Sequence, residues 1–191
     1  MDPYVYPGTN VLRNLLDIQA PQRLASFEMD MTTQRLIELA VEPIMAGRLD
    51  AAHLRAIHRY IFQDVYDWAG QFRTVNIARS GQYYFAFWDR IEPALHDTLS
   101  KLNRERQLAG LERGAFCARA GYFLGEINAV HPFRDGNGRT QREFIRQLAV
   151  RNGFRLNWSR VTRDQMSAAS MASFLKGDNT GLVEAIATAI D

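Results

Sequence analysis

Apolar residues recur at the spacing of an α-helix along most of this 191-residue chain, and this pattern constrains the fold more than any other feature. Leu54, Ile57 and Ile61 fall on one helix face, and Asp50 before them is a suitable N-cap. Comparable helical stretches begin at about Pro21 (interrupted at Pro43), cover residues 116–130 and 144–149 (with a stop at Gly153), and begin again at about Thr180. The pattern predicts an all-α helical bundle.

Two further helices are predicted from capping boxes, in which an N-cap side chain is followed three residues later by an acid or amide. Asp89 precedes Glu92 at the start of a helix expected to reach about Gly110, and Thr162 precedes Gln165. No repeat, low-complexity tract or linker divides the chain. Residues 1–191 are therefore expected to form one domain, whose first 20 residues are extended.

Only one segment of the chain favours β-structure. Residues 74–77 and 83–87 are rich in β-branched and aromatic side chains, and Ser80-Gly81 between them is typical of a turn. We therefore expect a small β-hairpin over about residues 74–87, attached to an otherwise helical domain.

Composition excludes several classes of protein. The chain is 47% apolar and 23% charged, and its net charge of +2 gives no bulk attraction to nucleic acid or anionic membranes. The single cysteine, Cys117, lies in an apolar helical stretch and is expected to be a packing residue. No apolar run reaches the length of a membrane span and no signal pattern opens the chain. We expect a cytoplasmic protein, or one made there and exported by another route.

The most informative segment runs from His131 to Arg142 and combines residue types suited to a nucleoside triphosphate. Gly136, Asn137 and Gly138 open a helix with little side-chain bulk. Free backbone N–H groups at the positive end of that helix can bind phosphate, and the Asn137 amide can donate to a phosphate oxygen. This part of the segment predicts an anion site.

The remaining residues of the segment add the groups that transfer chemistry needs. Arg139 and Arg142 are three residues apart and share a helix face, where their guanidinium groups suit the outer phosphates. Asp135 offers a carboxylate for Mg²⁺, which needs little else from a protein once phosphates are bound. His131 can take a proton from an incoming hydroxyl, and Phe133 is expected to anchor the loop in the core.

These residues resemble a known family. The segment His131–Arg142 matches the Fic signature His-Pro-Phe-x-(Asp/Glu)-Gly-Asn-Gly-Arg-x-x-Arg at every position. Tyr66–Arg73, the opening Asp-Pro-Tyr and the stretch 157–169 are also similar to Fic toxins of the toxin–antitoxin type and to Fic domains of secreted bacterial effectors. The resemblance spans essentially the whole chain.

The resemblance implies a Fic fold and a protein adenylyltransferase, which moves AMP from ATP to a Tyr, Thr or Ser hydroxyl of a target protein and releases pyrophosphate. It implies that His131 is the general base and that Asp135 binds Mg²⁺. The loop 136–138 would hold the α- and β-phosphates, and Arg139 and Arg142 the β- and γ-phosphates. Residues 131–152 would form the active-site loop and its helix.

The family also gives the hairpin a role, as a flap that pairs with the target backbone like an added strand. Here the flap would run from about Asn76 to Phe87. Ile77, Tyr83, Tyr84 and Phe85 are the residues expected to contact the target or the adenine. An aromatic cluster of this kind is equally typical of core packing.

Many Fic proteins carry an inhibitory helix with the pattern Ser/Thr-x-x-x-Glu-Gly/Asn, whose glutamate pairs with the second arginine. The nearest match is Thr180–Ala185, which has alanine at its last position and is typical of an ordinary terminal helix. We expect that a separate antitoxin chain supplies a glutamate to Arg142. The resemblance suggests type II topoisomerase subunits or host small GTPases as targets, in the bacterial cytoplasm or after translocation into a host cell.

Other functions remain open from the residues alone. Some Fic enzymes transfer UMP, GMP or phosphocholine, although Gly138 stands where a kinase-like branch has lysine. A catalytically silent interaction module is disfavoured by the intact signature, and a nucleic-acid protein by arginines spread over several elements without a helix-turn-helix. A P-loop kinase or zinc hydrolase is excluded by pattern, so His53, His58 and His96 are expected to be surface or packing residues.

Overall fold

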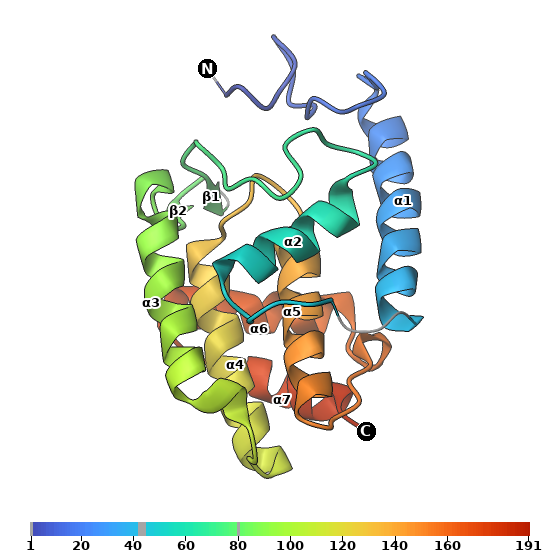
Figure 1. Cartoon of the computed structure of the whole chain (residues 1–191). Coiled ribbons are helices and arrows are strands. Elements are labelled where there is room, and N and C mark those ends of the chain that lie inside the picture. Colours follow the sequence, from blue (N-terminus) through green and yellow to red (C-terminus); the bar gives the residue numbers. More distant parts are fainter. Residues whose placement is uncertain (1, 42–44, 80) are drawn as a thin grey trace.

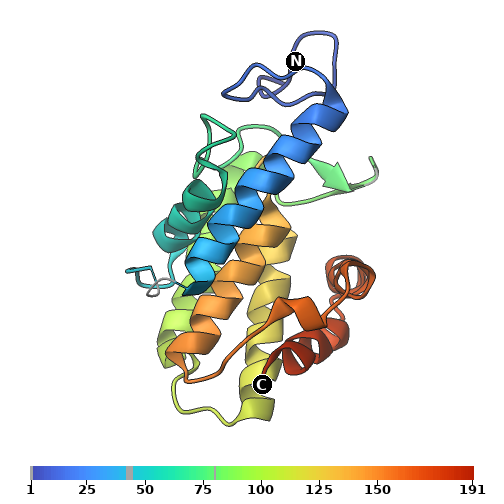
Figure 2. The ribbon, with the colours of Figure 1, turned by 90° about the vertical axis from the view of Figure 1, so that its right-hand side faces the viewer.

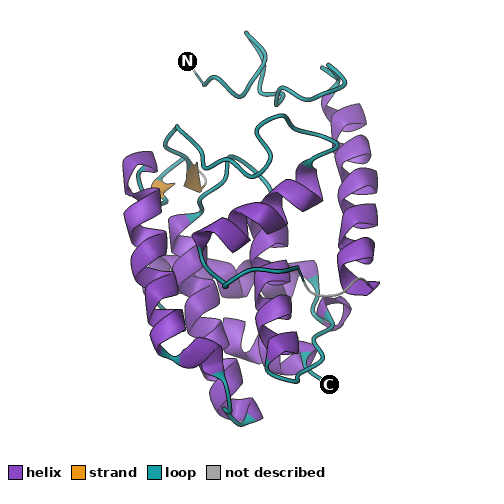
Figure 3. Ribbon diagram, in the orientation of Figure 1, coloured by secondary structure: helices purple, strands orange, loops and turns teal. Residues whose placement is uncertain are grey.

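The computed structural model describes residues 2–41, 45–79 and 81–191 and has the helical architecture expected from the sequence (Figures 1 and 3). Within these ranges the chain forms seven α-helices and one two-stranded antiparallel sheet. The helices are α1 (Pro21–Val41), α2 (Ala51–Phe62), α3 (Ile91–Arg104), α4 (Arg113–Val130), α5 (Asn137–Arg151), α6 (Arg163–Lys176) and α7 (Thr180–Ala189), and the strands are β1 (Ala78–Arg79) and β2 (Tyr83–Tyr84).

Helix α4 lies at the centre of the bundle and packs against α3, α5, α6 and α7. More than half of its residues are buried, which is typical of a helix with neighbours on several sides. Phe116, Phe123 and Ile127 are completely buried along it, and Cys117 is 2% exposed, as expected for a packing residue. The central position of α4 matters because its last turn leads directly into His131.

Helix α1 lies along the outside of α2 and α5, as Figure 2 shows. Leu24 and Leu39 are buried, whereas Ile37 is 60% exposed. Arg35 on α1 forms an ion pair with Asp64, which lies two residues after the end of α2, and its Nε is 2.6 Å from Oδ2 of Asp64. The interruption expected at Pro43 falls outside the described residues. None of the described helices combines the length and apolar character needed to cross a bilayer.

The starts predicted at Pro21 and Thr180 are confirmed, and of the three predicted N-caps two are right and one is wrong. Asp50 caps α2 by accepting the His53 N–H at 2.9 Å, and Thr162 with Gln165 forms a capping box on α6. The capping box expected at Asp89 is absent, because Trp88–Arg90 form a short 3₁₀ turn and α3 begins without a side-chain cap.

Helix α3 ends at Arg104, earlier than the expected end near Gly110. The next residues, 106–108, have positive φ angles and turn the chain. This turn buries Leu108, which is 1% exposed, and returns the chain toward α4. The chain therefore buries the side chain of Leu108 in this turn instead of continuing helix α3 to Gly110.

The hairpin projects from the end of the bundle at which the loop between α4 and α5 lies (Figures 1 and 2). Its register pairs Ala78 with Tyr84 and Arg79 with Tyr83. The paired part is shorter than the expected 74–87 because the carbonyls of Val75 and Ala86 accept hydrogen bonds from a buried side chain, Arg73, instead of from a neighbouring strand. The turn residue Ser80 lies outside the described residues.

Candidate active site

The loop between α4 and α5 reverses the chain over six residues, 131–136, and presents polar groups at one end of the bundle. His131 ends α4 in the left-handed region with φ +49°, a conformation that costs a non-glycine residue free energy and is often found at functional sites. Gly136 precedes α5 with φ +76°, and a Cβ on it would overlap the ring of Phe62. Only glycine fits both the backbone angle and the space at this position.

The imidazole of His131 is held in one orientation. Its Nδ1 lies 3.2 Å from the carbonyl oxygen of Asn128 and donates its hydrogen to it, which leaves Nε2 free to accept a proton. One face of the ring stacks on Phe85, with centroids 3.8 Å apart and planes 12° from parallel. Burial, assisted by the nearby positive charge of Arg73, lowers the pKa of His131 to about 4. The ring is therefore neutral at pH 7 and able to act as a base.

A cavity of about 540 Å³ lies between this imidazole, the start of α5 and the hairpin. The first N–H groups of a helix have no carbonyl partner within it, so those of α5 face this space with the positive end of the helix dipole. The cavity is lined by Ile77, Ala78, Arg79, Phe85, His131, Arg134, Asp135, Gly136, Asn137, Gly138, Arg139 and Arg142. The structure thus brings nine of the eleven expected site residues into one cavity, and the other two, Tyr83 and Tyr84, lie on β2, which pairs with the lining residues Ala78 and Arg79.

The two signature arginines have different surroundings. Arg142 makes no ion pair or side-chain hydrogen bond with any residue that the structure describes, and burial together with the charge of Arg139 lowers its pKa. Arg139 donates from Nη2 to Glu28 at 2.5 Å and lies over the ring of Phe62 at 4.6 Å. Arg142 is therefore the freer of the two to bind an anion.

Asp135 meets the requirements of a single-carboxylate metal ligand. Its side chain is 49% exposed, and Oδ1 accepts the N–H of Gly136 at 2.5 Å and lies 3.9 Å from Nη2 of Arg139. Removal of water around the carboxylate, together with the negative charge of Glu28, raises the pKa of Asp135. A cation beside this carboxylate would be favourable, and its second oxygen remains available to bind one.

Asn137 has a different role from the one expected. It is 3% exposed, and its amide accepts the Phe133 N–H at 2.9 Å and donates to the Phe133 carbonyl at 2.8 Å. The side chain therefore closes the loop, and both its oxygen and its nitrogen are hydrogen-bonded to the Phe133 backbone. Phe133 itself is completely buried, as expected.

His58 supports the same loop from α2, which the sequence did not indicate. Its Nδ1 accepts the Gly70 N–H at 2.8 Å, so Nε2 carries the hydrogen and donates to the carbonyl of Asp135 at 3.1 Å. The ring stacks between Phe62 and Phe133, with centroids 4.6 and 3.9 Å away. Burial lowers its pKa to about 3, so it stays neutral.

The other two histidines are further from the site. His53 is buried and pairs with Gln147 at 2.9 Å, whereas the side chain of His96 is 79% exposed. His53 and His96 are therefore packing and surface residues, as expected. His58 is also a packing residue, but the expectation did not include its contact with the loop.

Two other residues that support the site were also missed. Glu28 on α1 binds Arg139 and also accepts a hydrogen bond from the hydroxyl of Tyr66. Arg73 lies in the stretch that resembled the family, but its side chain had no assigned role; it donates to the carbonyl of His131. Their partners are 111 and 58 residues away in the sequence, so no local pattern could reveal the contacts.

The aromatic residues of the flap separate into two groups. Phe85 is 7% exposed because it packs on His131, and the half-buried Ile77 lines the cavity. Tyr83 and Tyr84 are 51% and 59% exposed on β2. The flap therefore keeps two aromatic side chains at its surface, while the third packs on His131.

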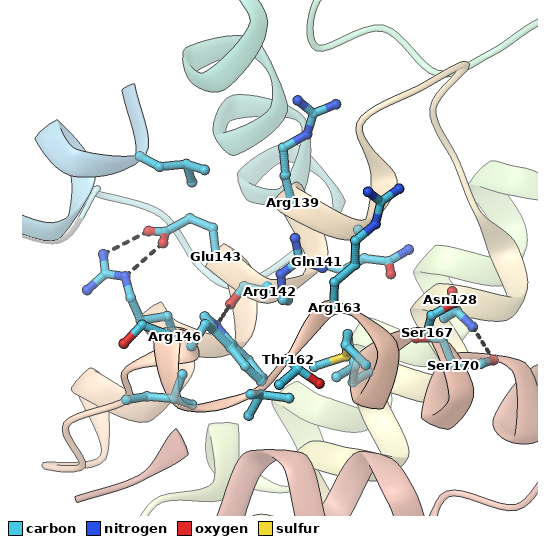
Figure 4. A pocket seen from close by; sticks show the side chains of 18 of the residues that line it. Asn128, Arg139, Gln141, Arg142, Glu143, Arg146, Thr162, Arg163, Ser167 and Ser170 are labelled. Carbon is cyan, nitrogen blue, oxygen red and sulfur yellow. Dashed lines mark hydrogen bonds and ion pairs between the residues drawn. The ribbon is translucent and has the colours of Figure 1, made fainter. Parts of the chain in front are cut away.

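A larger cavity of about 880 Å³ adjoins the first and shares Arg79, His131, Gly138, Arg139 and Arg142 with it. Figure 4 shows Arg142 between Arg139 on the same helix and Arg163 from α6. The apolar residues that line the larger cavity include Leu36, Ile37 and Ala40 from α1 and Trp158 and Val161 from the segment before α6. The segment Thr180–Ala185 does not supply a partner for Arg142, because it belongs to α7, where Glu184 is exposed and the helix packs on α4 and α6.

Comparison with known proteins gives the family. Residues 48–149, which include the whole loop and most of α5, match the Fic/DOC family. This chain belongs to the Fic/DOC family. It is 43% identical to protein adenylyltransferase VbhT of Bartonella schoenbuchensis over 97% of its own length and 38% of that protein, so it spans well under half of VbhT.

Two more comparisons agree. The Fic chain is 38% identical to the probable protein adenylyltransferase Fic of Escherichia coli, covering 95% of its own length and 88% of that protein. It superimposes on the AMPPNP-bound effector BepC of Bartonella tribocorum with a TM-score of 0.91 and 26% identity, over 98% and 96% of the two chains. The expected family, the Fic fold and the adenylyltransferase class are confirmed.

Proposed function

We propose that this Fic chain transfers AMP from ATP to a hydroxyl side chain of another protein. The observation that supports this most strongly is the shared cavity, in which a neutral imidazole faces helix-terminal amides, a carboxylate and two arginines. A hydroxyl between His131 and the phosphates would lose its proton to Nε2 as its oxygen attacks the α-phosphorus. The bond from that phosphorus to the β-phosphate breaks, and pyrophosphate leaves.

The residues present divide this work between them. The N–H groups at the start of α5 bind the α- and β-phosphates, and Arg139 and Arg142 bind the β- and γ-phosphates. Asp135 would hold Mg²⁺, which when bound neutralises charge on the phosphates and on the departing pyrophosphate. Placement and charge stabilisation supply most of the rate in this class of reaction.

The acceptor protein binds to the flap. Among the described residues, β1 and β2 pair only with each other, so a target segment can add to a free edge of the hairpin by backbone hydrogen bonds. Tyr83 and Tyr84 are exposed there to contact it. Type II topoisomerase subunits and host small GTPases are the first targets to test.

A nucleic-acid partner is disfavoured because several arginines are already neutralised. Arg134 pairs with Asp2, Arg146 with Glu143, and Arg160 with the carboxylate of residue 191. Arg79, Arg139 and Arg142 line both cavities, which suit a small anion better than an extended nucleic-acid backbone.

We also propose that a separate antitoxin chain restrains the enzyme by placing a glutamate on Arg142. This arginine has no partner among the described residues, and the apolar wall of the larger cavity offers a surface for an amphipathic helix. Expression of the chain alone should then slow bacterial growth, whereas His131→Ala should not. Equal growth of both strains would argue against a restrained toxin.

The transfer itself is tested with purified protein, Mg²⁺ and α-labelled ATP in a bacterial lysate. His131→Ala should lower protein labelling by about a hundredfold to ten-thousandfold, the usual loss when a positioned base is removed. His96→Ala is the matched control, because His96 is exposed on α3, and it should label normally. Labelled UTP, GTP and CDP-choline in parallel reactions identify the preferred donor. Undiminished labelling by His131→Ala would refute the mechanism.

A further inference from the structure

Arg73 is almost completely buried, with 1% of its surface exposed. Within the described residues it forms no ion pair with a carboxylate, and four hydrogen bonds lead from its guanidinium group to backbone carbonyl oxygens. Burial lowers the pKa of Arg73 to about 10, so the group remains positively charged at neutral pH. Burying a charge without a counter-ion is unfavourable, which makes a specific role for these contacts more plausible than general packing.

Two of the four carbonyls belong to the end of α4. Nε donates to the oxygen of His131 at 2.8 Å, and Nη2 donates to that of Val130 at 3.1 Å. The last carbonyls of a helix lack partners within it and carry the negative end of its dipole, so a cation is favourable there. Arg73 also donates its backbone N–H to the carbonyl of Pro132 at 2.9 Å. Its side chain and backbone together bind three successive residues around the base.

The other two carbonyls belong to the two roots of the flap. Nη1 donates to Val75, which precedes β1, at 2.7 Å. Nη2 donates to Ala86, which follows β2, at 2.5 Å. The same group therefore connects both roots of the flap to the peptide of His131. Phe85, next to Ala86, stacks on the imidazole, so the bond at Ala86 also fixes the ring that covers the base.

We propose that Arg73 is a positioning residue, which sets the distance between the base His131 and an acceptor hydroxyl bound along the flap. The inference rests on the proposed transfer to a protein acceptor. Arg73 does not line the anion cavity, and the part of the loop nearest α5, residues 133–136, is held by other groups, Asn137 and His58. Loss of the Arg73 contacts should therefore impair transfer while leaving nucleotide binding intact.

The test compares the wild type with Arg73→Lys, which keeps the charge but has one nitrogen and cannot reach both flap roots and α4 together. The matched control is Arg113→Lys, since Arg113 also bonds to backbone carbonyls, those of Ala187 and Ile190, at the opposite end of α4. Nucleotide affinity is measured with AMPPNP by calorimetry. Transfer is measured with α-labelled ATP, as the rate at which each variant labels the lysate protein that the wild type modifies. This rate is divided by the fraction of the variant that binds AMPPNP.

Arg73→Lys should bind AMPPNP within about twofold of the wild type and transfer on the order of 100-fold more slowly, because a displacement of about 1 Å can cost this much in rate. Arg113→Lys should match the wild type in both measurements. Transfer by Arg73→Lys within threefold of the wild type per binding-competent molecule would overturn the inference. If the wild type labels no protein, the proposed function has failed instead.

Two additional results separate positioning from support of the fold. If Arg73→Lys does not fold, Arg73→Gln, which removes the buried charge, is tested in its place. If neither variant folds, Arg73 serves the fold and the inference is wrong. Phe85→Leu should also slow transfer, and the double variant with Arg73→Lys should lose little more than the stronger single variant, since both act on one geometry. Fully additive losses would overturn the inference.

Discussion

Gly136→Ala tests whether the start of α5 depends on close contact with α2. The residue has φ +76°, and left-handed backbone costs an alanine about 1–2 kcal/mol relative to glycine. The added Cβ would also overlap the ring of Phe62, which is completely buried and cannot move toward solvent. Overpacking of this kind costs about 1–3 kcal/mol, so the substitution should lower the free energy of unfolding by about 2–5 kcal/mol.

Gly110→Ala provides the control for the backbone contribution alone. Gly110 has nearly the same angle, φ +79°, and no atom lies within 4 Å of a Cβ built on it. Gly110→Ala should lower the free energy of unfolding only by the cost of the left-handed backbone, about 1–2 kcal/mol. Urea unfolding of both variants gives the difference, which isolates the overlap with Phe62. Equal losses in the two variants would refute the contact between Gly136 and Phe62.

The same substitution should affect catalysis through Phe62. The guanidinium of Arg139 lies 4.6 Å above this ring, and His58 stacks on it at 4.6 Å. A displaced ring would therefore move Arg139, a proposed phosphate ligand, together with one support of the loop. Labelling by folded Gly136→Ala should fall, whereas that of Gly110→Ala should not.

Three further predictions concern protonation, the metal ligand and the loop. Burial holds the pKa of His58 near 3 and that of His131 near 4, whereas histidines in the unfolded chain have pKa values near 6.5, so the unfolded chain binds more protons as the pH falls below 6.5. The free energy of unfolding should therefore fall by about 2 kcal/mol for each histidine from pH 7 to pH 5. Urea unfolding at several pH values measures this, and a flat profile would contradict it. Asp135→Asn should remove most of the Mg²⁺ dependence of AMPPNP affinity in calorimetry; an unchanged dependence would place the metal elsewhere. Asn137→Ala leaves the buried N–H of Phe133 without a partner and should cost about 2 kcal/mol in urea unfolding, more than substitution of an exposed asparagine.

Local patterns in the sequence predicted the helices and the order of groups in the loop. The stripe on α4, the cap at Asp50 and the run from His131 to Arg142 each depend on residues within a few positions of one another. The capping box expected at Asp89 failed although its residue types were right, because the preceding segment must leave the hairpin through a 3₁₀ turn. A cap signal describes what a segment can do in isolation, and tertiary connections can override it.

The supports of the site could not be predicted because they join segments that are distant in the chain. His58 contacts the loop from 77 residues away, and a buried histidine has the same local sequence whether or not it bonds to a catalytic segment. Asn137 illustrates the opposite case. Its residue type suggested a phosphate ligand, and only the position of the Phe133 backbone shows that its amide is already used.

The ion pairs from the first part of the chain have a practical consequence for anyone trimming this domain. The stretch that matches the family begins at residue 48, yet Asp2 binds Arg134 and Glu28 binds Arg139. A fragment cut at that boundary would retain every signature residue and still release two guanidinium groups beside the turn at the start of α5. Such a truncated protein should be inactive because it lacks the two carboxylates that hold these arginines. Its inactivity would therefore not be evidence against the proposed chemistry.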